Sequence, residues 1–379
     1  MRICFVADAG SIHTKKWVRY FAEKGHEVHL ISLKPFYSDK IGNVQYHILR
    51  SIPPQIRIIS VIINTIWFLV QMRRLVRRIK PDIINGHYIT DCGFIAALSG
   101  FHPLVISTWG SDVFVDPYKS VINNHIVKFA LKRADLVTTM AQYTADYVHS
   151  EFNVPSGKIK MFHWGENIDL FQKGYVSEAK TLRKTLNIDD SSFIVLSPRT
   201  MGVLYGIEFI IESLPYIIKK HPNVCFVFLK GCSTDSSYEN RLQRIAKRAG
   251  VEEYTRFVSR YLDKEEMAIY YNMSDVFISI PRTDQFASCI VEGMACGSIP
   301  IVGNLEVYRE YLTDGNNAFF VDRENPEDIA EKVTYCIEHP EAKERFYEVN
   351  REIVKKKLDW SNNAPLMYES YQSLLKVGS

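Results

Sequence analysis

Apolar runs alternate with mixed stretches through most of this chain. In the first half, short apolar runs suited to buried strands are separated by stretches with the apolar spacing of amphipathic helices. This alternation predicts a parallel sheet wrapped by helices, and so an α/β fold. We expect strands at residues 3–7, 27–32, 82–85, 104–107 and 136–139, and helices at 15–24, 91–99 and 119–132.

The pattern breaks near residues 160–171, where Gly165 and Asn167 precede a polar stretch that runs to about residue 190. A second alternation follows, with strands at 193–197, 224–230, 256–258, 276–280 and 299–302, helices at 207–220, 238–249 and 264–272, and then the pair 318–321 and 326–337. It predicts a second Rossmann-like domain of similar size.

A chain of 379 residues is too long for one compact core. We therefore expect Rossmann-like domains over 1–168 and 169–357, and a C-terminal helix over 358–379 that packs back on the first domain. Ligands of open parallel sheets bind beyond the carboxyl ends of the strands. Two such domains facing each other would create one cleft, lined by the polar loops at their strand ends.

Composition narrows the class of protein. With 46% hydrophobic and 23% charged residues, the chain is typical of globular proteins, and a net charge of +3 is too small to indicate nucleic-acid binding. Seven scattered cysteines favour reduced thiols in a cytoplasmic protein. The chain has no Asp-x-Asp and no clustered His and Cys, so we expect no metal site. It also lacks the motifs of P-loop NTPases and serine hydrolases.

One apolar segment, residues 58–70, is followed by four arginines and a lysine within residues 73–80. Thirteen residues interrupted by polar ones fall short of the roughly 20 that span a bilayer. An ordinary core helix with a basic end is one interpretation. We favour contact with an anionic membrane surface, because Trp67 and Phe68 add aromatic rings suited to an interface.

The stretch TDQFASCIVEGMACG at residues 283–297 is the strongest functional signal. Asp284 and Glu292 straddle the expected start of a short buried helix, which Ser288 would cap and Gly297 would end. A helix start presents free N–H groups to a phosphate, whereas carboxylates suit sugar hydroxyls. The stretch therefore predicts a ligand with anionic and hydroxyl-rich parts. The alternative is that Glu292 only pairs with a neighbouring loop.

Other candidates also follow predicted strands. Arg199, after the first strand of the second domain, could grip a diphosphate and stabilise charge on a departing nucleoside diphosphate; alternatively, it pairs with an acid at the surface. Gly10 could let the backbone approach a phosphate, and His13 could face the cleft, although a plain strand-to-helix turn also explains this loop. His87 and Asp112 are candidates for hydroxyl binding or general-base help, and each could equally be structural.

In order and spacing, these residues resemble the retaining glycosyltransferases of family 4, which have the two-domain GT-B fold. The resemblance runs along essentially the whole length. The Glu-x7-Glu motif of that family would correspond to Asp284 to Glu292, followed by Met294, Ala295, Cys296 and Gly297. Further landmarks are EKGHEVHLIS at 23–32, PDIINGHY at 81–88, WGSD at 109–112, ADLVTTM at 134–140 and YLTDGNNAFFV at 311–321.

The resemblance implies a role for each matching position. Glu292 would hold the ribose hydroxyls of a sugar nucleotide, and Asp284 would lie by the donor sugar. Arg199 would neutralise the diphosphate, Gly10 would approach it from the first domain, and the backbone near 256–258 would contact the base. The donor site is then expected to comprise Gly10, His13, Arg199, Tyr205, Lys230, Phe257, Val258, Ala287, Ser288, Cys289 and Glu292, with Arg199, Asp284, His87 and Asp112 as the catalytic candidates.

The chain departs from the family pattern at two positions. The first acid is Asp284 rather than Glu, and the usual lysine before Gly206 is Tyr205. Lys230, Arg282, Lys15 and Lys16 are candidates to supply the missing charge. The resemblance implies metal-independent transfer of a hexose or N-acetylhexosamine from a nucleoside diphosphate sugar to a hydroxyl of a lipid-linked or cell-envelope glycan, and we favour UDP over GDP as the nucleotide. A weakly catalytic nucleotide-binding partner subunit is the alternative, and an epimerase or phosphorylase is a third hypothesis.

Overall fold

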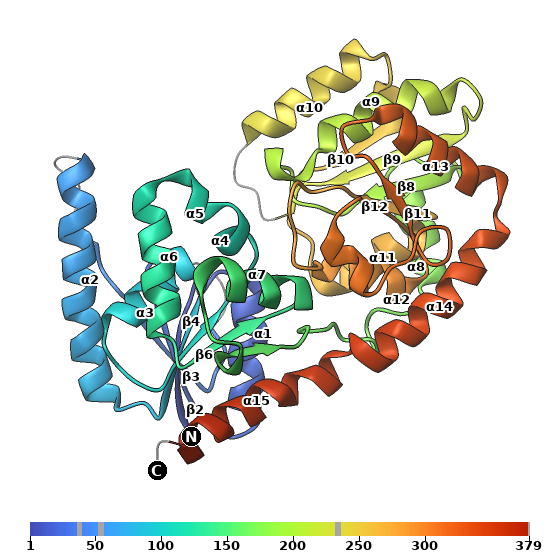
Figure 1. The fold of residues 1–379 in the computed structure, drawn as a ribbon. Helices are drawn as coiled ribbons and strands as arrows, with labels where there is room; N and C mark the ends of the chain where they lie inside the picture. Colours follow the sequence, from blue (N-terminus) through green and yellow to red (C-terminus); the bar gives the residue numbers. More distant parts are fainter. Residues whose placement is uncertain (36–39, 52–56, 232–235, 378–379) are drawn as a thin grey trace. The chain divides into compact units, whose positions relative to one another are not determined.

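The computed structural model describes residues 1–35, 40–51, 57–231 and 236–377 of the chain, which divides into two compact units. Unit 1 comprises 1–163 with 364–379, and unit 2 comprises 164–363. Each unit is an α/β domain with one parallel sheet and helices on both faces (Figure 1). The predicted α/β fold with two Rossmann-like sheets is confirmed.

Unit 1 is built on a seven-stranded parallel sheet in the order β3-β2-β1-β4-β5-β6-β7. Its strands are β1 (Arg2–Val6), β2 (Glu27–Ser32), β3 (Val44–Ile48), β4 (Ile83–His87), β5 (Leu104–Ser107), β6 (Leu136–Thr139) and β7 (Ile159–Met161). Its helices are α1 (Ile12–Glu23), α2 (Arg57–Ile79), the π-helical turn η1 (Ile89–Gly93), α3 (Phe94–Leu98), α4 (Ser111–Phe114), α5 (Asp116–Lys119), α6 (Val121–Arg133), α7 (Gln142–Phe152) and the 3-10 turn η2 (Ser156–Lys158).

The last helix, α15 (Trp360–Val377), ends in unit 1. Its buried Tyr371 stacks on Phe21 of α1 with ring centroids 5.1 Å apart. The Tyr371 hydroxyl also accepts a 2.7 Å hydrogen bond from Asn85 of β4. The end of the chain is therefore part of the core of unit 1.

Unit 2 has a six-stranded parallel sheet in the order β10-β9-β8-β11-β12-β13. Its strands are β8 (Phe193–Ser197), β9 (Val224–Leu229), β10 (Thr255–Val258), β11 (Val276–Ser279), β12 (Ile299–Gly303) and β13 (Phe319–Val321). Its helices are α8 (Val176–Thr185), η3 (Val203–Tyr205), α9 (Ile207–Ile218), α10 (Ser236–Arg248), η4 (Glu252–Tyr254), α11 (Lys264–Met273), α12 (Ser288–Cys296), η5 (Glu306–Glu310), α13 (Pro326–Glu338) and α14 (Glu341–Lys357).

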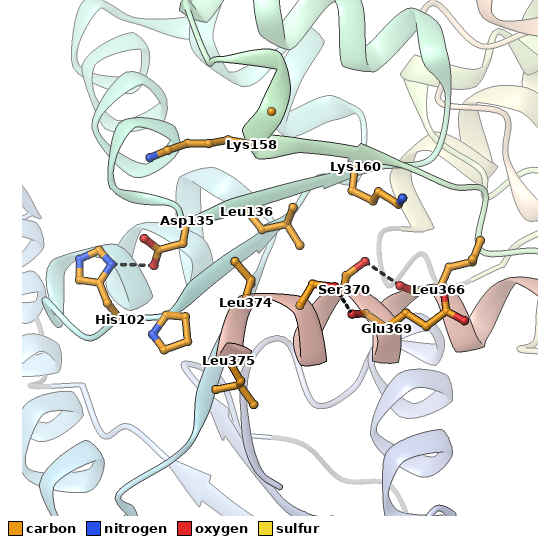
Figure 2. Close-up of a pocket in the computed structure, with 13 residues that line it drawn as sticks. His102, Asp135, Leu136, Lys158, Lys160, Leu366, Glu369, Ser370, Leu374 and Leu375 are labelled. Atoms are coloured by element: carbon orange, nitrogen blue, oxygen red, sulfur yellow. Dashed lines mark hydrogen bonds and ion pairs between the residues drawn. The ribbon is translucent and has the colours of Figure 1, made fainter. Parts of the chain in front are cut away.

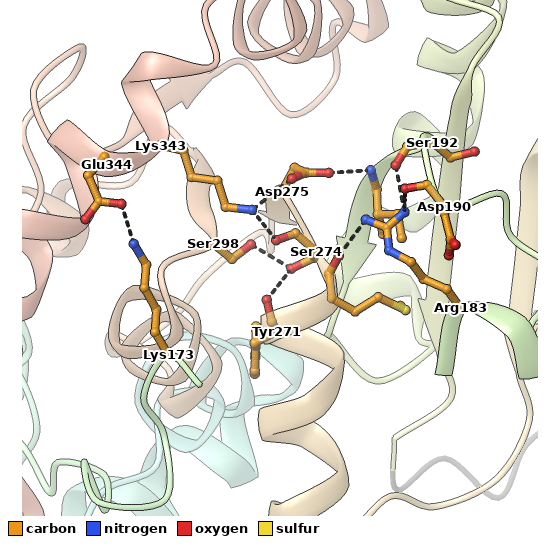
Figure 3. Close-up of polar contacts among 12 residues, drawn as sticks. Lys173, Arg183, Asp190, Ser192, Tyr271, Ser274, Asp275, Ser298, Lys343 and Glu344 are labelled. Carbon is orange, nitrogen blue, oxygen red and sulfur yellow. Dashed lines mark hydrogen bonds and ion pairs between the residues drawn. The ribbon is translucent and has the colours of Figure 1, made fainter. Parts of the chain in front are cut away.

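The inner strands β4, β5, β9 and β12 are buried along their whole length, as expected for parallel strands covered on both faces. At the amino ends of β8 and β11 in unit 2, Asp275 accepts a hydrogen bond from the backbone N–H of Ile194 and pairs with Lys343 of α14 (Figure 3). This network ties α14 to one edge of the sheet. The loops lie at the opposite edge, at the carboxyl ends of the strands.

The two segments that pass between the units run side by side within unit 2. Glu166 N–H donates to the Leu358 carbonyl at 2.9 Å, and Trp360 N–H donates to the Glu166 carbonyl at 3.0 Å. Gly165 has φ of +75°, and a Cβ there would lie 2.7 Å from the Asp359 backbone. Only glycine fits this crossing without strain.

Candidate functional site

The strand order of each sheet reverses at one point. In unit 2 this switch lies between β8 and β11, which are neighbours although far apart in sequence. Ligands of open parallel sheets bind beyond the carboxyl ends of the strands at such a point. Arg199 follows β8 and Asp284 follows β11, so both residues predicted from sequence lie at the switch point of unit 2.

Arg199 and Asp284 form a largely buried ion pair there. The Arg199 Nη1 atom lies 2.9 Å from Asp284 Oδ2, and the side chains are only 11% and 9% exposed. The same oxygen accepts a 2.8 Å hydrogen bond from the hydroxyl of Tyr308, and Oδ1 accepts one from the backbone N–H of Gln285. Burial alone would lower the pKa of Arg199, but the Asp284 carboxylate more than offsets this and holds it well above its usual value.

Tyr205 occupies the position where a lysine was expected, and it packs against Arg199. The guanidinium lies 4.4 Å from the centre of the Tyr205 ring, within the range of a cation–π contact. Gly206 follows with φ of +66°, and a Cβ there would lie 2.7 Å from Arg323. The aromatic ring therefore orients the arginine, and the positive φ favours glycine at position 206.

Helix α12 begins beside this pair. Its N-cap is Ala287 rather than Ser288, and no side chain caps it, so the prediction that Ser288 caps the helix is wrong. The reason is the strained turn before it, where Phe286 has φ of +65° and its buried ring packs on Tyr311. Ser288 is the first helical residue instead. In the first turn, the Ile290 N–H donates to the Ala287 carbonyl at 3.0 Å. The first N–H groups of a helix otherwise lack a partner within the helix, which suits an anion placed next to Arg199.

Glu292, one turn further along α12, lies in a second charged cluster. Its Oε1 atom is paired with Lys264 of α11, and Oε2 accepts a 3.2 Å hydrogen bond from Tyr271. Lys264 Nζ also lies 3.3 Å from Glu166, whose side chain is 3% exposed. Burial lowers the pKa of Lys264, but the two carboxylates outweigh this and raise it above the ordinary lysine value.

The two clusters are joined through α12. Cys289 lies between them, because its Sγ atom is 3.4 Å from Arg199 and its carbonyl accepts a 2.9 Å hydrogen bond from Tyr271. The sequence predicted no role for Lys264, Glu166, Tyr271 or Tyr308. No local sequence pattern marks them, because their contacts join segments that are far apart along the chain.

Three further predicted positions of unit 2 lie on strands or strand ends. Lys230, a candidate to supply the missing charge, is held by Glu239 at 2.9 Å in a pair whose side chains are 15% and 7% exposed. Phe257 stacks on Phe228 of the neighbouring strand, with centroids 5.2 Å apart. The Val258 carbonyl accepts a 3.0 Å hydrogen bond from the backbone N–H of Lys230.

Unit 1 brings together its own predicted loops at the switch between β1 and β4. The ring of Trp109, after β5, meets His13 at 5.5 Å and His87 at 5.9 Å, both edge to face. Burial lowers the pKa of His87 to about 3, and the nearby His13 adds to this effect, so His87 is neutral. Gly10, in the loop after β1, is exposed and donates its N–H to the Asp8 carboxylate at 2.8 Å.

Asp112 is fully buried in unit 1, and its carboxylate binds backbone N–H groups. Oδ1 accepts from Trp109 and Gly110 at 2.9 and 2.8 Å, and Oδ2 accepts from Ile89 at 2.9 Å. Burial raises the pKa of this carboxyl to about 6, against the lowering effect of those three N–H groups. Asp112 thus ties the loop after β5 to the loop after β4 and orients Trp109.

A pocket of about 890 Å³ lies at the opposite edge of the sheet of unit 1 (Figure 2). It is bounded by α15 and by the amino ends of three strands, at Leu136, Pro103 and Lys158. Because ligands of such sheets bind at the carboxyl ends, this pocket is separate from the candidate site. Among the described residues, no group of three or more His, Cys, Asp or Glu side chains is arranged to hold a metal ion.

Two Rossmann-like domains with parallel sheets are the architecture of the GT-B fold, and comparisons with protein families support this class. Residues 2–141 match the family described as glycosyl transferase 4-like, and residues 178–353 match the glycosyl transferases group 1. The two matches together span most of the chain. The chain therefore carries two segments, each of which matches a domain family of glycosyl transferases.

Individual relatives are distant. Spore coat protein SA of Bacillus subtilis is 23% identical over 245 residues, which cover 62% of this chain and 64% of that protein, less than two thirds of its length. Alpha-monoglucosyldiacylglycerol synthase of Acholeplasma laidlawii is 22% identical over 343 residues, 84% of this chain and 81% of that protein.

A solved structure, that of Anabaena Alr3699/HepE in complex with UDP-glucose, superposes with a TM-score of 0.81. It is 17% identical and covers 99% of this chain and 100% of that one. At this level of identity the likeness shows the fold.

Proposed function

We propose that the chain is a retaining, metal-independent glycosyltransferase of family 4 that moves a hexose or N-acetylhexosamine from a nucleoside diphosphate sugar to an acceptor hydroxyl. The observation that carries the proposal is the Arg199–Asp284 pair at the switch point of unit 2, beside the start of α12. Arg199 and the first N–H groups of α12 stabilise the charge that develops on the departing diphosphate. UDP is the preferred nucleotide, a choice supported by the UDP-glucose complex of the Anabaena protein.

Four of the remaining site residues also have roles in this proposal. Asp284 accepts a hydrogen bond from a hydroxyl of the donor sugar. Arg199 and Tyr308 hold the Asp284 carboxylate in place. Glu292 accepts hydrogen bonds from the hydroxyl groups of the ribose. In unit 1, the neutral His87 lies beside Trp109 and has the role of binding an acceptor hydroxyl, because its lowered pKa makes it a weak base, whereas Asp112 positions their loops.

We propose a lipid-linked or cell-envelope glycan as the acceptor, with contact to an anionic membrane through α2. The segment Arg57–Ile79 contains five arginines and no acidic residue, and among the side chains described from Ile63 onward, Ile66 and Trp67 are exposed. Each basic residue near an anionic surface contributes about 1 kcal/mol. The Acholeplasma relative, named for a diacylglycerol product, supports a lipid acceptor. None of the described helices has the length and apolar content needed to cross a membrane.

Purified protein should be offered UDP-sugars and GDP-sugars together with polyprenyl-linked acceptors. We expect transfer, or slow hydrolysis of one donor, that EDTA leaves unchanged and that yields a product of the same anomeric configuration. If no donor is transferred or hydrolysed, the proposal fails.

A second candidate function is a nucleotide-binding partner subunit with weak catalysis. It is favoured by one observation, the aromatic Tyr205 where a lysine was expected. Tight nucleotide binding without turnover, unchanged in Tyr205→Lys, would support this candidate over an active transferase.

A further inference from the structure

The side chain of Lys264 contacts the carboxylate of Glu292. Its ammonium is paired with Glu292 and with Glu166, and it lies 5.2 Å from the centre of the Phe171 ring. The Lys264 side chain is 29% exposed, whereas those of Glu292 and Glu166 are 6% and 3% exposed. A ligand group that approaches Glu292 from solvent therefore meets Lys264 at the same place.

The chemistry of the pair suits hydroxyl groups. A hydroxyl both donates and accepts hydrogen bonds, whereas an ionised carboxylate only accepts and an ammonium only donates. Glu292 keeps acceptor capacity beyond its bonds to Lys264 and Tyr271, because a carboxylate has about four lone-pair sites. Lys264 has three N–H groups, and its two carboxylate partners leave further donor capacity. Together, the two side chains can therefore bind a hydroxyl group both as a donor and as an acceptor.

We propose that Lys264 and Glu292 together recognise the vicinal diol of the donor ribose, with Glu292 accepting from a hydroxyl and Lys264 donating to one. Lys264 is thus a specificity-determining residue that separates ribonucleotides from their deoxy forms. The inference rests on the proposed function, because it assigns Lys264 as a second residue that binds the ribose beside Glu292. Glu166 anchors Lys264 from the other side and stops the ammonium from swinging away into solvent.

The test is a cycle that removes the lysine and the hydroxyl separately and together. The affinities of UDP, 2′-deoxy-UDP and 3′-deoxy-UDP are measured by calorimetric titration against the wild type, Lys264→Met and Lys264→Arg, and the three guanosine counterparts are measured in parallel. We expect the wild type to lose roughly ten- to hundredfold in affinity when the recognised hydroxyl is missing, as for a hydrogen bond to a charged group. In Lys264→Met the loss for the hydroxyl that Lys264 contacts should shrink to within about threefold, because the ribonucleotide alone is weakened, whereas the loss for a hydroxyl bound only by Glu292 should remain. Lys264→Arg, which keeps a charged donor, should restore part of the discrimination.

Lys343→Met is the matched control, because it removes another lysine–carboxylate pair of unit 2. Lys343 lies 2.8 Å from Asp275 at the amino end of β11, away from the strand ends that form the candidate site (Figure 3). This variant should lose stability while keeping the wild-type preference for the ribonucleotide. Its result separates a general loss of folding from a loss of recognition.

Each other outcome has a definite meaning. Equal weakening of ribo and deoxy nucleotides in Lys264→Met would give the lysine a purely structural role and overturn the inference. Tighter ribonucleotide binding in that variant would mean that Lys264 blocks Glu292, and would overturn it as well. If the wild type binds none of the six nucleotides, the proposed function itself fails, which is a different result from binding without discrimination.

Discussion

The Arg199–Asp284 pair should show strong energetic coupling. Removing one partner of a buried ion pair costs about 3–5 kcal/mol when the other charge is left without compensation. Here Asp284 would keep the Tyr308 hydroxyl and the Gln285 N–H, so we expect Arg199→Met to cost about 2 kcal/mol. Asp284→Asn should cost a similar amount, because it leaves the buried guanidinium without a counter-charge.

The double variant should be less destabilised than the sum of the single ones. When both charges are absent no unpaired charge remains, so we expect a coupling energy of about 1.5–3 kcal/mol. Native-state hydrogen exchange on peptides from β8 and β11 is the suitable assay, because it reports the opening of unit 2 separately from unit 1. Effects that add within about 0.5 kcal/mol would refute the pair as an energetic unit.

Three other features give sharper local tests. Gly293→Ala would force a methyl group into the Phe277 ring and should destabilise unit 2 by about 2 kcal/mol in urea unfolding, whereas Gly157→Ala, which has open space, should be neutral. Because burial raises the pKa of Asp112 from 3.8 to about 6, the folded chain holds that proton longer than the unfolded chain, and this carboxyl should favour folding less as pH rises from about 4 to about 6. The stability difference between wild type and Asp112→Asn should follow this trend, and a pH-independent difference would contradict it. Arg77→Glu should reduce co-sedimentation with anionic vesicles but not with neutral ones, and equal binding by both proteins would remove α2 from the contact.

Strands buried on both faces were predictable from sequence because they are short continuous apolar runs. The segments 27–32, 104–107, 136–139 and 193–197 have the predicted bounds. The sequence did not predict β3 or β7, which lie at the edges of the first sheet and are only partly buried. Helix α8 was also missed, because its sequence VSEAKTLRKT is mostly polar and buries only Ala179.

The site was predictable where it depends on strand ends. Arg199 and Asp284 were found because each follows an apolar run, and parallel strands bring such positions to one edge. The partners Lys264 and Tyr308 were not predictable, because their contacts depend on how α11 and η5 pack around α12. Local patterns carry no information on such distant pairings.

The same limit applies to individual side-chain roles. Asp112 was a catalytic candidate from its place after a strand, yet its carboxylate faces three backbone N–H groups. Lys230 was a candidate cation for the diphosphate, yet Glu239 holds it. In both cases the position along the chain was informative, but the direction of the side chain was set by packing.

Calorimetric titration of UDP against the wild type, Arg199→Met, Glu292→Gln and Lys343→Met tests the donor site most directly. We predict saturable binding by the wild type, a loss of roughly tenfold or more in each of the two site variants, and wild-type affinity in Lys343→Met. Equal affinity in all four proteins would contradict the placement of the nucleotide beside α12.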